Sequence, residues 1–311
     1  MKKLFVFVII WFLSLLLFPL FGQHFINPFN TTDIMFKIWI ETRIPRTIMG
    51  LIAGGNLAVS GYMLQNILLN SLATPYTLGI STGASIGVLF SVIFIPGLIF
   101  GEIFAFIGAL SGVILAIFIS KKSGEITVIN LILAGIVINV LFSSIILLFY
   151  FFAPPNLSLQ ILHWLIGSLE TIGVFKPLFF MCLSIIFLLI AIISHRELDI
   201  LILGKEQAKS LGVDYGKYFL LFIVISTVLT AVVVSETGPI SFIGLIIPHI
   251  LRLMKINRAI EAIPLNFLAG GIFLTFTDTV ARLIVPNANL PVGIVTAFLG
   301  GLFFLYIIKK A

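Results

Sequence analysis

The sequence predicts an all-α, polytopic membrane protein with about ten transmembrane helices and both termini in the cytoplasm. Of its 311 residues, 60% are hydrophobic and only 10% are charged, and the mean hydropathy is +1.24. A soluble domain carries roughly 45–50% apolar and about 25% charged residues. This chain has too few polar side chains to cover a water-soluble core, whereas a lipid bilayer covers an apolar surface without them.

Apolar segments recur along the chain, separated by short polar or Pro/Gly-containing loops. Each is close to the ~20 residues that cross a bilayer as a helix. No composition shift marks a second domain, so a single transmembrane domain over residues 1–311 is predicted. The expected spans are residues 4–21, 46–64, 77–95, 101–119, 128–152, 177–194, 217–235, 240–251, 262–284 and 292–308.

Two of these segments leave alternatives open. The first, within MKKLFVFVIIWFLSLLLFPLFGQ, resembles a cleaved signal sequence. Its apolar run of about 17 residues is longer than a typical signal core, and no small-x-small cleavage motif follows, so we expect a retained helix. The eighth, GPISFIGLIIPHIL, would form about 21 Å of helix, less than the ~30 Å hydrocarbon core. A short buried or partly re-entrant helix is its alternative.

The distribution of Lys and Arg favours ten crossings over nine. With ten crossings only five basic residues lie outside, namely Lys37, Arg43, Arg46, Lys176 and Arg282. If the eighth segment did not cross, the basic residues at 252, 255, 258, 309 and 310 would join them. The same topological bias accounts for the net charge of +6, and we expect no nucleic-acid binding.

Glycines at four-residue spacing inside the predicted helices indicate close helix packing. Examples are Gly50-x-x-x-Gly54 and Gly83-x-x-x-Gly87. Such pairs let helix backbones approach each other where lipid supplies no hydrophobic driving force.

Residue patterns for enzymatic chemistry are missing from the sequence. There is no Gly-rich phosphate loop ending in Gly-Lys-Ser/Thr, no His-Glu-x-x-His and no Gly-x-Ser-x-Gly, so any ATP hydrolysis would need a partner subunit. The four histidines lack metal-ligand spacing, and the one cysteine, Cys182, lies in an apolar run. We therefore predict that the chain is not an enzyme and has neither a metal site nor a cofactor.

Four motifs follow one another along the chain. They are Arg43-Ile-Pro-Arg46 running into TIMGLIAGGNLAVSGYMLQNILLNSLATPYTLGISTGAS, LGKEQAKSLGV at 203–213, SETGPISFIGL at 235–245 running into PHILR, and TDTVAR at 277–282 followed by LPVGIVT. In this order they resemble the FecCD/BtuC-type permeases of binding-protein-dependent ABC importers for iron-siderophores, haem and cobalamin. The resemblance extends from about residue 43 to the C-terminus.

The resemblance implies a function and a set of partners. A chain of this type is a multi-pass permease of the plasma (inner) membrane that translocates an iron-siderophore complex, or haem or cobalamin, into the cytoplasm. Its implied partners are a second copy of itself, two cytoplasmic ATP-binding subunits, an extracytoplasmic substrate-binding protein and the lipid bilayer. The cargo stays open among these classes.

The resemblance also assigns a role to three outer arginines. Arg43, Arg46 and Arg282 match positions that receive acidic side chains of the substrate-binding protein. A guanidinium suits this role because its planar fork binds a carboxylate bidentately and stays charged. Two other interpretations are snorkelling at the membrane interface and, for Arg282, an i,i+4 pair with Asp278.

Residues 203–213 match the loop that couples such a permease to its ATPase. The matching positions are Leu203, Gly204, Glu206, Ala208, Leu211 and Gly212. Good helix formers lie between the two glycines, which predicts a short cytoplasmic helix. The alternative is a solvated turn without a partner.

A third site is the loop between the second and third spans, which narrows the pore on the cytoplasmic side in similar permeases. Asn70, Leu72 and Pro75 match the family pattern, whereas Ser71 replaces a usual proline and removes one fixed φ angle.

The alternative function is an ion-coupled secondary transporter. Asp278 is the acid most clearly within a predicted span, and an intramembrane acid is a functional candidate by default.

Overall fold

The computed structural model describes residues 2–22, 25–28, 30–95, 98–122, 125–284 and 290–310. Within these residues the regular secondary structure is helical apart from one very short hairpin, β1 (Lys121–Lys122) paired antiparallel with β2 (Glu125–Ile126). The all-α prediction is therefore confirmed except at this hairpin. Residues 1–62, 167–193 and 240–311 form one compact unit, and residues 63–166 and 194–239 form another.

The first unit contains the helices from the two ends of the sequence. These are α1 (Lys2–Leu17), η1 (Phe18–Leu20), α2 (Asp33–Ile38), η2 (Trp39–Arg43), most of α3 (Ile44–Ile67), α8 (Phe175–Ile193), α12 (Ile243–Leu253), α13 (Ala259–Ile284) and α14 (Val292–Lys310). Helix α13 packs against α1, α8, α12 and α14. It therefore links these four helices, whereas α3 is the helix that is buried almost throughout.

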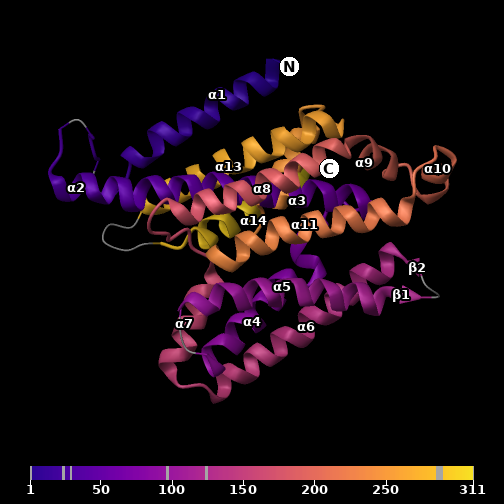
Figure 1. The fold of residues 1–311 in the computed structure, drawn as a ribbon, viewed down its shortest axis with the longest axis horizontal. Helices are drawn as coiled ribbons and strands as arrows, with labels where there is room; N and C mark the ends of the chain where they lie inside the picture. The colour runs from indigo at the N-terminus through magenta and orange to yellow at the C-terminus, as the bar shows by residue number, and fades with distance from the viewer. Residues whose placement is uncertain are drawn as a thin grey trace. The chain divides into compact units, whose positions relative to one another are not determined.

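The second unit is built around α5 (Leu98–Ser120), which packs against α4 (Ile80–Phe94), α6 (Val128–Phe152) and α11 (Tyr215–Thr237). The short hairpin directly follows α5, and α10 lies beside the start of α11 at the same end (Figure 1). The remaining elements are η3 (Pro75–Leu78), α7 (Pro155–Ile166), α9 (His195–Leu201) and α10 (Lys205–Ser210).

Each of the ten predicted spans coincides with a helix. Among the described residues, seven helices are long and apolar enough to cross a membrane. The other three predicted spans match shorter apolar helices at Ile80–Phe94, Ile243–Leu253 and Val292–Ile307. Helix α12 is short, as expected, and its buried side includes Ile243, Ile247 and Pro248. The number of crossings stays a prediction.

Glycines bring the helices of each unit into backbone contact, as their spacing predicts. In the first unit a Cβ on Gly54 would overlap the carbonyl of Gly270, so α3 and α13 touch through their backbones. In the second unit Gly83 of α4 and Gly108 of α5 face each other in the same way. These contacts depend on the absence of side chains, because any Cβ would push the helices apart.

Candidate functional site

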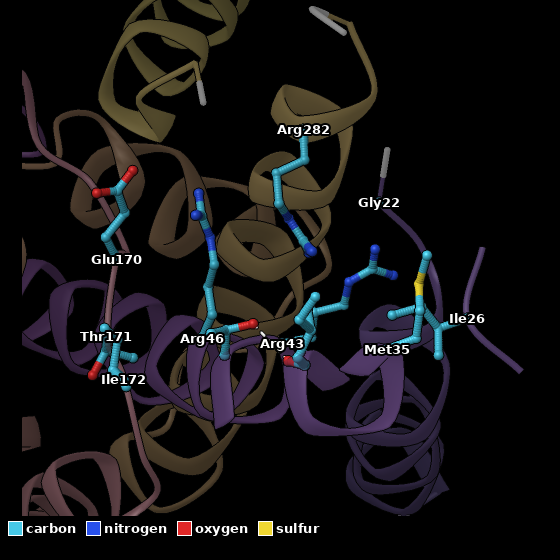
Figure 2. A pocket seen from close by; sticks show the side chains of 11 residues that line it. Gly22, Ile26, Met35, Arg43, Arg46, Glu170, Thr171, Ile172 and Arg282 are labelled. Carbon is cyan, nitrogen blue, oxygen red and sulfur yellow. Dashed lines mark hydrogen bonds between the residues drawn. The ribbon is translucent and has the colours of Figure 1, made fainter. Parts of the chain in front are cut away.

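The three predicted docking arginines line one cavity of about 460 Å³ in the first unit (Figure 2). Arg43 ends η2 and Arg46 lies in the first turn of α3, whereas Arg282 comes from the last turn of α13. The sequence predicts all three only through the family resemblance, and the structure brings them to one cavity. Glu170, which the sequence did not single out, lines the same cavity.

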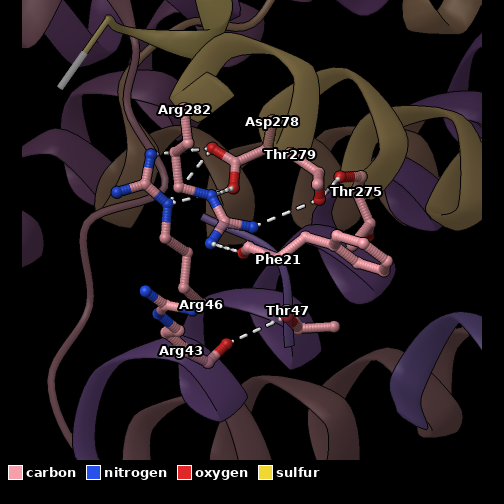
Figure 3. Close-up of polar contacts among 8 residues, drawn as sticks. All are labelled: Phe21, Arg43, Arg46, Thr47, Thr275, Asp278, Thr279 and Arg282. Atoms are coloured by element: carbon pink, nitrogen blue, oxygen red, sulfur yellow. Dashed lines mark hydrogen bonds and ion pairs between the residues drawn. The ribbon is translucent and has the colours of Figure 1, made fainter. Parts of the chain in front are cut away.

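A single carboxylate holds two of the arginines (Figure 3). The Nε of Arg46 donates to both oxygens of Asp278, at 3.1 and 3.0 Å, and its Nη2 donates to Oδ1 at 2.7 Å. The Nε of Arg282 forms an ion pair with Oδ2 of Asp278 at 3.1 Å. The i,i+4 pair of Asp278 and Arg282 was therefore a correct alternative, and Arg46 is a second partner that local spacing does not indicate.

Backbone carbonyls at the end of η1 accept further guanidinium hydrogen bonds. Arg282 donates from Nη1 to the carbonyl of Phe21 at 3.1 Å and from Nη2 to Thr279 Oγ1 at 3.2 Å. Arg43 donates from Nη1 to the carbonyl of Leu20 at 3.3 Å. The chain after α1 therefore helps to fix the arginines, because its last carbonyls point at them.

The three arginines differ in exposure. The side chains of Arg46 and Arg282 are only 10% and 8% exposed, whereas Arg43 is half-buried. Three positive charges face one buried acid, Asp278, and one exposed acid, Glu170. The cavity is therefore electropositive, and Arg43 is the arginine most accessible to an incoming carboxylate.

The predicted coupling segment contains the expected short helix. Helix α10 begins after Gly204, whose φ is 96°, and ends in a Schellman motif in which the N–H of Val213 donates to the carbonyl of Ala208 at 2.9 Å and that of Gly212 to Lys209 at 3.1 Å. Gly212 has a φ of 75°, which glycine adopts at little cost. The loop is thus a defined element and not an irregular turn.

Side-chain exposure divides the coupling segment into a packed side and an outer side. Ala208 is fully buried, whereas Leu203 and Leu211 are 55% and 56% exposed. Glu206 is also exposed. Two exposed leucines on either side of a polar helix offer apolar contacts that a partner protein could cover.

The predicted gate segment, residues 70–75, is restrained by the side chain of Asn70. The Oδ1 of Asn70 accepts from the N–H of Leu72 at 2.9 Å, and the carbonyl of Asn70 accepts from Ala73 N–H at 3.0 Å. This Asx turn restrains the loop at the position where Ser71 replaces a proline. Pro75 is buried at the start of η3, and Leu72 is 61% exposed.

Comparison with known proteins gives a consistent result over nearly the whole chain. A family model described as the FecCD transport family matches residues 6–310. The hemin transport system permease protein HmuU of Yersinia pestis is 33% identical over 287 residues, which cover 90% of this chain and 86% of HmuU. The vitamin B12 import system permease protein BtuC of Vibrio cholerae is 30% identical over 304 residues, which cover 96% of this chain and 91% of BtuC.

A solved structure has the same fold. It is described as an inward-facing conformation of an ABC transporter of the metal-chelate type. The two chains share 27% sequence identity with a TM-score of 0.92, and the match covers 100% of this chain and 99% of the other.

Proposed function

Because the chain belongs to the FecCD transport family, we propose that it translocates a bulky iron chelate of the ferric-siderophore class, or haem or cobalamin, as the permease subunit of an ABC importer in the inner membrane. Relatives named for hemin and vitamin B12 import support a large, chelated cargo. The motor is a separate ATPase, because the sequence contains no P-loop.

One observation carries the proposal: arginines from two distant segments converge on one electropositive cavity. A substrate-binding protein that presents a carboxylate would find Arg43 at the accessible side of this cavity, with Arg46 and Arg282 behind it. Electrostatic attraction between these arginines and the partner's carboxylate orients the partner as it approaches. It raises the association rate more than it raises affinity. We assign direct contact to Arg43 and support of the cavity's charge to the other two.

The coupling role belongs to residues 203–213 in this proposal. A preformed helix of six residues, Lys205–Ser210, loses little conformational entropy when an ATPase subunit binds it. The exposed Leu203 and Leu211 would anchor that contact. Movement of the ATPase would then reach the membrane through α11, which begins directly after the loop.

The gate is assigned to residues 70–75. Leu72 is exposed and held by the Asx turn of Asn70, so two copies of the loop across a homodimer axis would present an apolar constriction. The homodimer itself is part of the proposal and follows the family arrangement.

An ion-coupled carrier fits the structure less well. Such a carrier needs an acid that exchanges a cation during transport. Asp278 already holds two guanidinium groups within hydrogen-bonding or ion-pairing distance, so its charge is compensated inside the protein. Loss of uptake when the partner ATPase is removed would support the importer, and persistent uptake would support the carrier.

The docking assignment is tested by Arg43→Glu in the permease reconstituted with its ATPase and binding protein. Placing an acid where a partner acid docks costs several kcal/mol, so we expect binding-protein affinity to fall about a hundredfold or more. Lys37→Glu is the matched control, because Lys37 is an exposed basic residue near the same segment that does not line the cavity. Equal docking by both variants and the wild type would contradict the assignment.

A further inference from the structure

A second cavity, of about 540 Å³, lies in the second unit next to the coupling segment. The hairpin after α5, helix α10 and the first turns of α11 enclose it. Its lining consists of Lys121, Ile126, Lys205, Lys209, Val213, Asp214, Tyr215, Gly216, Phe219 and Leu220. None of the functions proposed above uses this cavity.

The polar part of the cavity is basic. Lys121 from the hairpin and Lys205 and Lys209 from α10 are exposed and line it together. The acid among the lining residues is Asp214, whose Oδ1 accepts from the N–H of Lys217 at 3.1 Å and caps α11. Three lysines against one acid that already accepts a backbone hydrogen bond leave a net attraction for anions.

Much of the rest of the cavity is apolar and comes from the first turns of α11. Tyr215 stacks on Phe219, with ring centroids 5.6 Å apart, and Leu220 is 41% exposed. All three lie in the first turns of α11, which is long and apolar enough to cross the bilayer. If α11 crosses the bilayer as predicted, the cavity extends from the basic loops to the start of this span.

An occupant of this cavity must be anionic at one end and apolar at the other. We propose that it binds an anionic glycerophospholipid of the cytoplasmic leaflet, with the phosphodiester among the three lysines and an acyl chain against Leu220. Basic pockets between transmembrane helices on the cytoplasmic side are suited to such headgroups. An acidic side chain of a soluble partner, or free phosphate, would contact the lysines but would leave the apolar lining residues of α11 uncovered.

The site has a consequence for coupling that rests on the proposed function. Lys205 and Lys209 belong to the helix assigned to the ATPase, and Lys121 belongs to the hairpin after α5. A lipid bound to both would tie the coupling helix to the membrane surface. The lipid composition of the bilayer would then influence how ATP hydrolysis is coupled to transport.

The test is native mass spectrometry of the full-length purified permease, without ATPase or binding protein. Phosphatidylglycerol, cardiolipin and phosphatidylcholine are titrated separately. Each lysine near an anionic lipid contributes about fivefold in affinity. We expect the two anionic lipids to bind more tightly than phosphatidylcholine, and the variant Lys121→Gln, Lys205→Gln, Lys209→Gln to lose about a hundredfold of that affinity.

The matched control is Lys37→Gln, Lys176→Gln, Lys255→Gln, which removes the same charge from exposed lysines that do not line the cavity. It should bind like the wild type. If the triple variant does not fold, Lys121→Gln alone should lose about fivefold. Equal binding of phosphatidylcholine, equal losses in both variants, or competition by inorganic phosphate as strong as by lipid would overturn the proposal. Because no transport is measured, failure here leaves the importer proposal standing.

Discussion

Asp278 holds together the cavity lined by Arg43, Arg46 and Arg282 (the arginine cavity). It is almost completely buried, and its two carboxylate oxygens receive Arg46 from α3 and Arg282 from its own helix. Burying a guanidinium without a counter-charge is strongly unfavourable. The acid therefore gives two largely buried arginines a charged partner, and it leaves Arg43 as the most exposed arginine of the cavity.

Replacing Asp278 by Asn should destabilise the protein by about 3–5 kcal/mol, because two buried arginines lose their charged partner. Thermal unfolding of the purified permease in detergent measures this. Glu170→Gln is the control, since Glu170 lines the same cavity but is exposed, and its effect should be less than about 1 kcal/mol. An Asp278→Asn protein as stable as the control would show that the pair contributes little.

The sequence predicted this cluster only in part, for a reason of distance along the chain. Arg282 lies four residues after Asp278, and helix periodicity brings the two together. Arg46 lies 232 residues before Asp278, and only the packing of α3 against α13 joins them. Glu170 comes from an extended segment between helices that carries no periodic signal. A single sequence can therefore indicate local pairs but not this shared carboxylate.

At the scale of elements, backbone contact between α3 and α13 organises the first unit. Gly54 and Gly270 each lie where the other helix leaves no space for a side chain. This contact fixes the distance between Arg46 on one helix and Asp278 on the other, because both pairs lie on the same two helices.

Gly54→Ala should cost about 1–3 kcal/mol or more, because the new methyl group overlaps a backbone carbonyl that cannot rotate away. Gly301→Ala is the matched control in the same unit, since a Cβ there meets nothing within 4 Å. Unfolding midpoints of the two variants give the comparison. Equal midpoints would mean that the helices can separate at little cost.

The end of α10 makes a separate prediction about coupling. Gly212→Ala forces a side chain into the left-handed region at a cost of roughly 1–2 kcal/mol. If the displaced helix no longer meets the ATPase, uptake per ATP hydrolysed should fall about five- to thirtyfold. Gly101→Ala in the same unit is the control, because Gly101 has no positive φ and a Cβ there meets nothing within 4 Å. A coupling ratio unchanged in Gly212→Ala would argue against a role for the loop.

Most helices could be predicted because their apolar runs are long. Helix α7 (Pro155–Ile166) was missed, since its 12 residues are too few for a span and it starts at a Pro-Pro pair that indicates a loop. The hairpin of Lys121–Ile126 was also missed, because two-residue strands have no period to detect. Both lie between predicted spans, where hydropathy carries little information.

At the scale of the whole molecule, the proposed importer has two surfaces with different tasks. In this proposal the arginine cavity receives the substrate-binding protein outside the membrane, and residues 203–213 with the basic cavity beside them face the cytoplasm. The distribution of lysines and arginines supports this orientation, and membership of the FecCD transport family supports the division of labour. The orientation itself is the premise that all the other proposals share.

Sidedness of labelling tests that premise most directly. Single cysteines are introduced as Lys37→Cys and Glu206→Cys, both at exposed positions, after the one native cysteine is replaced by Cys182→Ser. A membrane-impermeant maleimide is applied to right-side-out and to inside-out vesicles. We expect position 37 to react only in right-side-out vesicles and position 206 only in inside-out vesicles. Reaction of both positions from the same side would contradict that premise.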